Sequence, residues 1–306
     1  MHLPGSRRSF KGARGTAVLI AAGALFLCHV TAVEAAGDYP VVYDLPAGVA
    51  VGETVRPTPL GANDWTCRPT AGHPRPVVLV PGLRGDPGWD FQAAAPLLAN
   101  NGYCVFAFDF KTQGRDAIEN VAPGLSQFVD RVLAATGAGK VDLLSHSEGG
   151  VVARYYLEVL GGADKVGVLA AISPLSHGTT LAGVATLLGG NPTAVSAISA
   201  VCPACAEQAA GSSFMQKLNA GGDTVRGVHY TVIGTRYEEV ITPYQSQFLS
   251  GRNVTNILLQ DQCSTDYVDH LASIYDSVAL RDALNAFDPP HAEPPRCTLV
   301  LPGVGG

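Results

Sequence analysis

The chain has 306 residues, of which 47% are hydrophobic and only 15% charged. It can therefore bury a sizeable core and does not have the composition of a disordered protein. The formal net charge is -6 and the isoelectric point about 5.7. No run of Lys or Arg follows the N-terminal segment, so we expect no nucleic-acid partner. The simplest interpretation is one α/β domain over residues 36–306, acting as a monomer.

The first 35 residues have the layout of an export signal. Basic residues precede an apolar stretch at about 16–33, as in exported proteins. Residues 6–11 (Ser-Arg-Arg-Ser-Phe-Lys) resemble the twin-arginine consensus and lack only an apolar residue between the aromatic residue and the lysine. We expect cleavage after Ala35 or Ala36 and secretion of the folded chain. The alternative, a retained membrane anchor, is weakened because the apolar run is barely long enough to cross a bilayer.

The cysteine count predicts disulfides. One of the seven cysteines, Cys28, lies in the signal, which leaves an even number in the exported chain. Six cysteines allow 15 pairings. The pairs that we expect are a local bond, a bond from a strand to the segment before the sheet, and a bond that ties down the tail: Cys202–Cys205, Cys67–Cys104 and Cys263–Cys297. A zinc or redox site at the local pair is disfavoured because no second close Cys or His pair accompanies it, and we expect no metal and no cofactor.

From Val77 onward, short apolar runs alternate with helical patterns, which predicts a mostly parallel sheet with helices on both faces. The predicted strands are Val77–Val80, Tyr103–Phe108, Val141–Leu144, Val166–Ile172, Val228–Ile233 and Val254–Leu259. The predicted helices are Phe91–Asn100, Ile118–Ala135, Gly149–Leu160 and about Ser273–Phe287.

Two stretches depart from this alternation. Residues 37–73 are rich in Pro, Gly and Thr without a sustained period, which predicts an extended segment on the surface. Residues 181–220 lie between the fourth and fifth predicted strands and are small and apolar. A connection of that length usually has a function or carries helices of its own.

Ser147 lies directly after an apolar strand and directly before a helical run. This is the context of a nucleophile elbow in the α/β-hydrolase fold, where the turn is tight and the neighbours two residues away must be small. Gly149 meets that requirement on one side, and Ser145 replaces the usual glycine on the other. We therefore predict that Ser147 is a nucleophile at a helix N-terminus, where the helix dipole favours developing negative charge.

A serine nucleophile needs backbone N–H donors for the oxyanion. The strand Val77–Val80 runs into Pro81-Gly82, and a glycine there lets the backbone approach the reacting carbonyl. The predicted donors are the backbone N–H groups of Leu83 and Glu148.

The predicted base is His270, in the polar loop between the last strand and the last helix. In this fold the order along the chain is serine, acid, histidine. The other downstream histidines fit less well, because His177 precedes the acid, His229 falls in a strand and His291 lies in the proline-rich tail.

The acid should follow the strand that begins at Val228, where Glu238 and Glu239 stand. Either could orient an imidazole. The acid in this fold usually opens a turn that ends at proline, which favours Glu238. Asp266 and Asp269 are close to His270 in sequence, but a loop role is expected for them.

Four phrases together resemble secreted bacterial triacylglycerol lipases of the class 2 lipase family. They are Val-Leu-Val-Pro-Gly, Ser-His-Ser-Glu-Gly-Gly-Val-Val-Ala-Arg-Tyr-Tyr, Thr-Arg-Tyr-Glu-Glu-Val-Ile-Thr-Pro-Tyr and Asp-His-Leu-Ala, and the likeness spans about Val77 to Ala283. The resemblance implies hydrolysis of lipid esters through an acyl-enzyme, with transient contact at a lipid–water interface. It carries over Ser147, Glu238, His270 and the two oxyanion donors.

Ser145 and the glutamate acid depart from the usual family pattern. Residues 181–220 are then a candidate acyl-binding wall or lid, or plain core packing. Three alternatives to a lipase remain: a short-chain esterase or polyesterase, an acyltransferase, and a catalytically silent binding protein.

Overall fold

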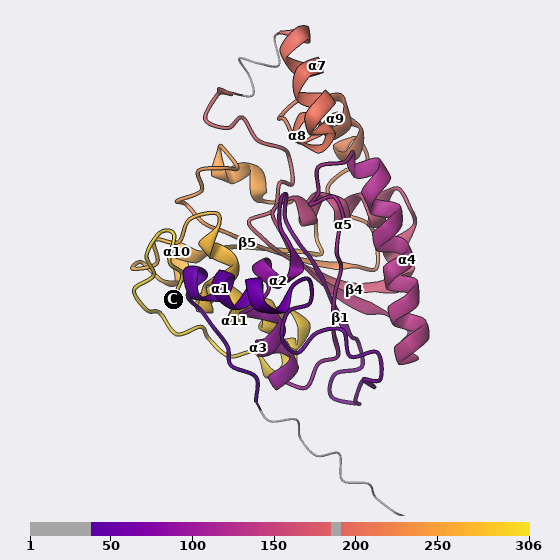
Figure 1. Cartoon of the computed structure of the whole chain (residues 1–306), viewed down its shortest axis with the longest axis vertical. Helices are drawn as coiled ribbons and strands as arrows, with labels where there is room; N and C mark the ends of the chain where they lie inside the picture. The colour runs from indigo at the N-terminus through magenta and orange to yellow at the C-terminus, as the bar shows by residue number, and fades with distance from the viewer. Residues whose placement is uncertain (1–37, 185–190) are drawn as a thin grey trace, which may run out of the picture. The chain divides into compact units, whose positions relative to one another are not determined.

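The structure, a computed structural model, describes residues 38–184 and 191–306. The predicted export signal lies outside these residues. Within them, parallel strands form one sheet in the order β2-β1-β3-β4-β5-β6 (Figure 1). The strands are β1 (Val77–Val80), β2 (Val105–Ala107), β3 (Val141–His146), β4 (Val166–Ile172), β5 (His229–Gly234) and β6 (Val254–Leu258). Every predicted strand is present, with ends that differ by up to two residues.

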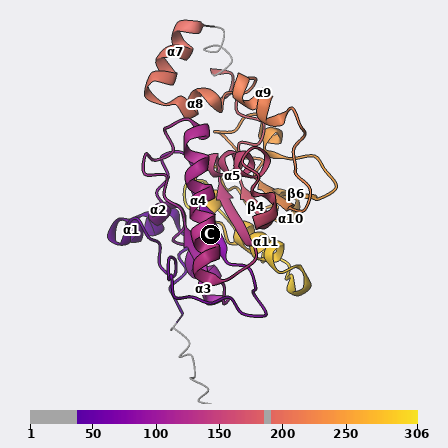
Figure 2. The same ribbon diagram turned by 90° about the vertical axis from the view of Figure 1, so that its right-hand side faces the viewer.

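Both faces of the sheet are covered, and every residue of the central strands β1 and β3 is buried. Along β1, Val78 and Val80 pack into one core, and Val77 and Leu79 into the other. The first core contains side chains of α4 (Ile118–Thr136) and α5 (Glu148–Glu158). The second contains side chains of α3 (Ala94–Asn100) and α11 (Ser277–Phe287). Figures 1 and 2 show α4 and α11 on opposite sides of the strands.

The predicted helices are present with modest changes. The first begins with a separate turn, α2 (Pro87–Asp90), before α3, and the last is preceded by the 3-10 turn η3 (Ala272–Tyr275). Helix α4 ends at Gly137, whose φ of 73° lies in the left-handed region that glycine adopts without strain. The remaining short elements in the described residues are η1 (Gly162–Lys165), η2 (Tyr244–Gln247), α10 (Leu259–Gln262) and η4 (Pro289–His291).

The expectation that residues 37–73 are extended is wrong over one stretch, which forms helix α1 (Leu45–Val55). The Asp44 side chain caps this helix by accepting the N–H of Ala47. Gly48 and Gly52, which disfavour a helix by up to about 1 kcal/mol each, lie on its buried face. A Cβ at Gly48 would lie 2.0 Å from the Tyr275 ring. Tertiary packing therefore stabilises a helix that local propensity does not predict.

The segment 181–220 carries helices of its own in its described part. They are α7 (Pro192–Val201), α8 (Pro203–Glu207) and α9 (Ser213–Asn219). Helix α9 buries Phe214, Met215 and Leu218 in the core, whereas α7 buries no residue. The segment therefore combines core packing with an exposed helix.

The structure contains the three expected disulfides, Cys67–Cys104, Cys202–Cys205 and Cys263–Cys297. Cys67–Cys104 joins the segment before the sheet to the start of β2, and Cys202–Cys205 joins the end of α7 to α8. Cys263–Cys297 ties the tail to the loop after α10. Among the helices of the described region, none is both long and apolar enough to cross a membrane.

Candidate active site

Ser147 stands in a strained turn between β3 and α5. Its φ and ψ are 52° and -121°, a region that residues with a side chain rarely occupy. The turn needs close backbone contact, since a Cβ at Gly149 would lie 2.2 Å from the carbonyl oxygen of Val80. Ser145 is fully buried in the strand on the other side, so a serine fits where glycine is usual. The geometry is that of the predicted nucleophile elbow.

Ser147, His270 and Glu238 form one hydrogen-bonded chain. His270 Nε2 lies 2.9 Å from Ser147 Oγ, and His270 Nδ1 lies 2.9 and 3.0 Å from the two carboxyl oxygens of Glu238. All three side chains are buried. This chain joins the ends of β3, β5 and β6, whose carboxyl ends lie at one edge of the sheet.

Glu238 is held by the backbone of its own turn. Its Oε1 accepts the N–H groups of Val240 and Ile241, both at 2.9 Å. These bonds fix the carboxyl group with both oxygens within 3.0 Å of His270 Nδ1. Glu239 has a different place: its Oε2 accepts the main-chain N–H of His270 at 3.2 Å, and burial raises the pKa of its carboxyl.

The other candidate histidines and aspartates lie outside the hydrogen-bonded series of Ser147, His270 and Glu238. The His177 ring contacts Asp223 at 3.0 Å, His291 pairs with Asp288, and His229 lies exposed at the start of β5. The side chain of Asp266 accepts the N–H of Val268, and that of Asp269 accepts the N–H of Ala272. Neither aspartate contacts the His270 ring.

The predicted oxyanion donors flank the serine. Gly82 packs against Ser147, because a Cβ there would lie 3.1 Å from the Cβ of Ser147, and Leu83 follows it. Glu148 is the first residue of α5. Among the described residues, neither the Leu83 N–H nor the Glu148 N–H donates to an acceptor, which leaves both free for a negatively charged oxygen.

A cavity of about 490 Å³ opens beside Ser147. Its walls come from α1, the loop after β1, the region of α2 and the His270 loop. The residues that line it are Leu45, Val49, Gly82, Leu83, Arg84, Gly85, Trp89, Asp90, Gln113, His146, Ser147, His270, Leu271, Ile274 and Tyr275. No residue of the described part of segment 181–220 belongs to this lining, so that part of the candidate wall or lid does not line the cavity.

His146 and Asp90 are parts of the site that the sequence did not reveal. The ring of His146 is buried, with Nε2 3.2 Å from the main-chain oxygen of His270 and Nδ1 3.7 Å from Asp90 Oδ2. The same Asp90 oxygen accepts the N–H of Gly82 at 2.8 Å. These contacts connect the elbow, the His270 loop and the loop after β1. The sequence gives one signal for this pair, the position of His146 directly before Ser147. It does not reveal the contacts, because Asp90 and His270 lie far from His146 in the sequence.

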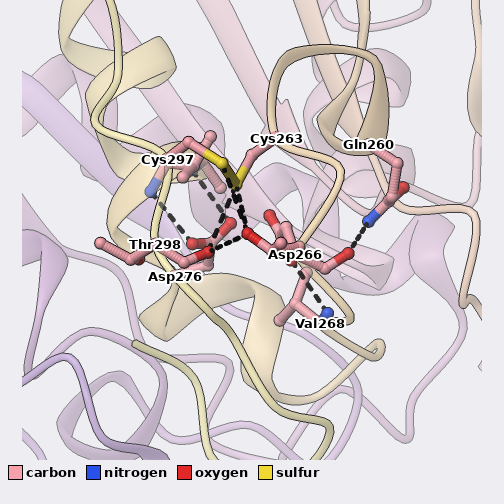
Figure 3. Close-up of a disulfide and its surroundings, with 10 residues drawn as sticks. Gln260, Cys263, Asp266, Val268, Asp276, Cys297 and Thr298 are labelled. Atoms are coloured by element: carbon pink, nitrogen blue, oxygen red, sulfur yellow. Dashed lines mark hydrogen bonds between the residues drawn. A yellow bond between two sulfur atoms is a disulfide. The ribbon is translucent and has the colours of Figure 1, made fainter.

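The His270 loop rests on a buried carboxyl pair. Asp266 and Asp276 are both fully buried, and burial raises the pKa of both carboxyls, most strongly that of Asp276, which the neighbouring Asp266 charge raises further. Asp276 also caps α11. Figure 3 shows this pair beside the disulfide Cys263–Cys297. The disulfide and the pair together hold the segment that carries the histidine.

The Glu148 side chain points away from the cavity into the protein. Its Oε2 accepts the side-chain amide N–H of Gln208 at 2.5 Å, and Oε1 has no hydrogen-bond partner among the described residues. Burial raises the pKa of this carboxyl to about 8. Gln208 follows α8, so this contact attaches the segment 181–220 to the elbow.

The described residues contain no cluster of three or more His, Cys, Asp or Glu side chains arranged to hold a metal ion.

Residues 74–281 match the family model of the class 2 lipases. The chain belongs to the class 2 lipase family. This class 2 lipase has the α/β-hydrolase fold.

Solved structures show the same fold at low identity. Lipase B of Aspergillus fumigatus superposes with a TM-score of 0.61 and 21% identity, over 78% of this chain and 56% of the fungal one. This class 2 lipase thus spans little more than half of the fungal chain. The mature form of the Bacillus licheniformis lipase BlEst2 superposes with a TM-score of 0.56 and 16% identity, over 72% of this chain and 94% of the bacterial one.

We predict that Glu238→Gln lowers kcat by about 10⁴-fold, because an amide cannot stabilise the imidazolium and favours the wrong tautomer of His270. Glu239→Gln is the matched control. A glutamine there can still accept the main-chain N–H of His270, so a loss of less than about tenfold is expected. Steady-state kinetics on one soluble ester measure both. Equal losses, or a larger loss at Glu239, would contradict the assignment of the acid.

We also predict that Glu148→Gln changes how stability depends on pH. The folded chain keeps the Glu148 proton between the ordinary pKa of 4.5 and about 8, whereas the unfolded chain releases it. The unfolded state then binds fewer protons, so the stability of the wild type falls by about 1.4 kcal/mol per pH unit across this window and levels off above it. The glutamine variant lacks this slope.

Urea unfolding at pH 5 and pH 9 tests this prediction. The free energy of unfolding of the wild type, relative to the variant, should fall by several kcal/mol between the two pH values. The other buried carboxyls are common to both proteins and cancel in this difference. A difference that is constant with pH would show that Glu148 is ionised at pH 5 in the folded state.

Proposed function

We propose that this class 2 lipase is a secreted triacylglycerol lipase in which Ser147, His270 and Glu238 act as a catalytic triad. The observation that carries the proposal is the continuous hydrogen-bonded chain through these three buried side chains. Each spacing is within the range at which a base can take a proton from a nucleophile and an acid can orient the base.

The proposed reaction begins with attack of Ser147 Oγ on the ester carbonyl carbon. His270 Nε2 takes the hydroxyl proton as the new bond forms, and Glu238 stabilises the resulting imidazolium. The N–H groups of Leu83 and Glu148 hydrogen bond to the negatively charged oxygen of the tetrahedral intermediate. When that intermediate collapses, the alcohol leaves with the proton from His270, and an acyl-serine remains.

Water completes the cycle. His270 removes a proton from a water molecule that attacks the acyl carbonyl, and a second oxyanion forms at the same donors. Its collapse returns the proton to Ser147 Oγ and releases the carboxylic acid. The groups of the site are thus unchanged after one turnover.

The cavity supports an apolar substrate. Most of its side chains away from the triad are aliphatic or aromatic, among them Leu45, Val49, Leu83, Leu271 and Ile274. Leu271, the neighbour of the base, is 58% exposed. An exposed leucine at the mouth of an apolar cavity suits transient contact with a lipid–water interface.

Disulfides support export, because such bonds persist in oxidising compartments. Three of them are present in the described residues. Secretion through a twin-arginine signal remains part of the proposal, since residues 1–35 lie outside the described residues.

We predict that kcat/KM for p-nitrophenyl esters rises from acetate to medium-chain acyl groups, and that emulsified triolein is cleaved. Each methylene that leaves water for the cavity contributes about 0.8 kcal/mol. A series from acetate to palmitate, together with a titration of fatty acid released from triolein, measures this. Ser147→Ala is the control, and its kcat should be lower by about a million-fold while its circular dichroism spectrum stays unchanged.

Two outcomes would contradict different parts of the proposal. A maximum at acetate without release of acid from triolein would make the protein a short-chain esterase and leave the triad unaffected. Full activity in folded Ser147→Ala would exclude Ser147 as the nucleophile.

A further inference from the structure

Helix α1 forms one wall of the cavity at Ser147. Leu45 and Val49 line it, and residues four apart lie on the same face of a helix. Gly48 and Gly52 lie on the neighbouring face and are buried. Ala50 is exposed. One face of α1 therefore packs on the protein while an adjacent aliphatic face is turned toward the reactive serine.

The helix is fixed to both sides of the cavity mouth. On one side, α1 packs against α2: a Cβ at Gly52 would lie 2.4 Å from the carbonyl oxygen of Gly88. Arg56, directly after α1, strengthens this attachment. It pairs with Asp86 at 3.1 Å and lies 4.6 Å from the centre of the Trp89 ring. On the side of the base, Gly48 packs on the ring of Tyr275 in η3.

The tail of the chain completes the attachment. The N–H of Leu45 donates to the carbonyl oxygen of Val304 at 2.6 Å, and the C-terminus lies beside α1 in Figure 1. The Tyr275 hydroxyl donates to the carbonyl oxygen of Trp89 beneath the helix. A wall held at its N-terminus, its C-terminus and its glycine face keeps its position when an apolar chain enters.

We propose that α1 sets the length of the ester hydrocarbon chain that this enzyme accepts, with Leu45 and Val49 as the residues that the chain contacts. The inference rests on the proposed ester hydrolysis at Ser147. It assigns chain-length selection to a helix outside residues 181–220, where the sequence suggested a lid. In both ribbon views α7, the exposed helix of that segment, lies well away from α1 (Figures 1 and 2).

The test enlarges one side chain at a time in the full-length secreted protein. Val49→Trp and Leu45→Trp place an indole in the cavity, and Ala50→Trp places it on the exposed face of the same helix. Val195→Trp places it on α7. The readout is the ratio of kcat/KM for laurate to that for butyrate in p-nitrophenyl esters. A second series with a fixed acetyl group and alcohols of increasing length shows whether the acyl or the alcohol chain lies against α1.

Loss of contact with two methylene groups corresponds to a decrease of about 15-fold in this ratio. We expect such a decrease in Val49→Trp and Leu45→Trp, in one of the two series, with butyrate or acetate activity retained. The ratio in Ala50→Trp and Val195→Trp should stay within about twofold of the wild type. Two cavity variants at different positions keep the test decisive if one of them fails to fold.

Three results would overturn the inference. The first is a wild-type ratio in both folded cavity variants. The second is an equal loss for short and long chains, which would mean that α1 affects the triad and not chain length. The third is a changed ratio in Val195→Trp alone, which would return the selection to the segment 181–220. A wild-type protein that cleaves no ester in either series would instead contradict the proposed function.

Discussion

The site depends on the left-handed backbone of Ser147. A φ of 52° at a serine is costly, and it persists because β3 and α5 are fixed on either side of it. Gly149 allows α5 to start against the carbonyl oxygens of Val80 and Pro81. The same packing brings Gly82 against Ser147, so the strained turn and the loop after β1, which carries the proposed oxyanion donor Leu83, are held by one contact. A side chain at Gly149 would clash with these carbonyl oxygens and move Ser147, the proposed nucleophile, away from Gly82.

The sheet order explains how distant residues reach this turn. Strands β3, β4, β5 and β6 are neighbours and parallel, so the loops that follow them meet at one edge. Glu238 follows β5, and its turn bonds aim it at a histidine that follows β6. His146 connects the His270 loop to the elbow through the main-chain carbonyl of His270. The His270 side chain is therefore oriented by contacts to its ring and to its main chain.

Much of this arrangement follows from local sequence. The strands were predictable because their apolar β-branched runs are bounded by turns, and Ser147 because its strand, glycines and helix are contiguous. Glu238 and His270 followed from the order of elements in the fold. Helix α1 was not predictable, because Gly48 and Gly52 oppose a helix locally and only their contacts with Tyr275 and Gly88 explain them. The contact of Asp90 with Gly82 and His146 depends on tertiary structure alone.

The central claim is that His270 and Glu238 make Ser147 a nucleophile. Labelling with a fluorophosphonate probe, followed by peptide mass spectrometry, tests it without assuming any substrate. We predict one label per chain on Ser147, and a second-order labelling rate that is lower by about a thousand-fold or more in His270→Ala. Labelling at another residue, or an unchanged rate in folded His270→Ala, would contradict it.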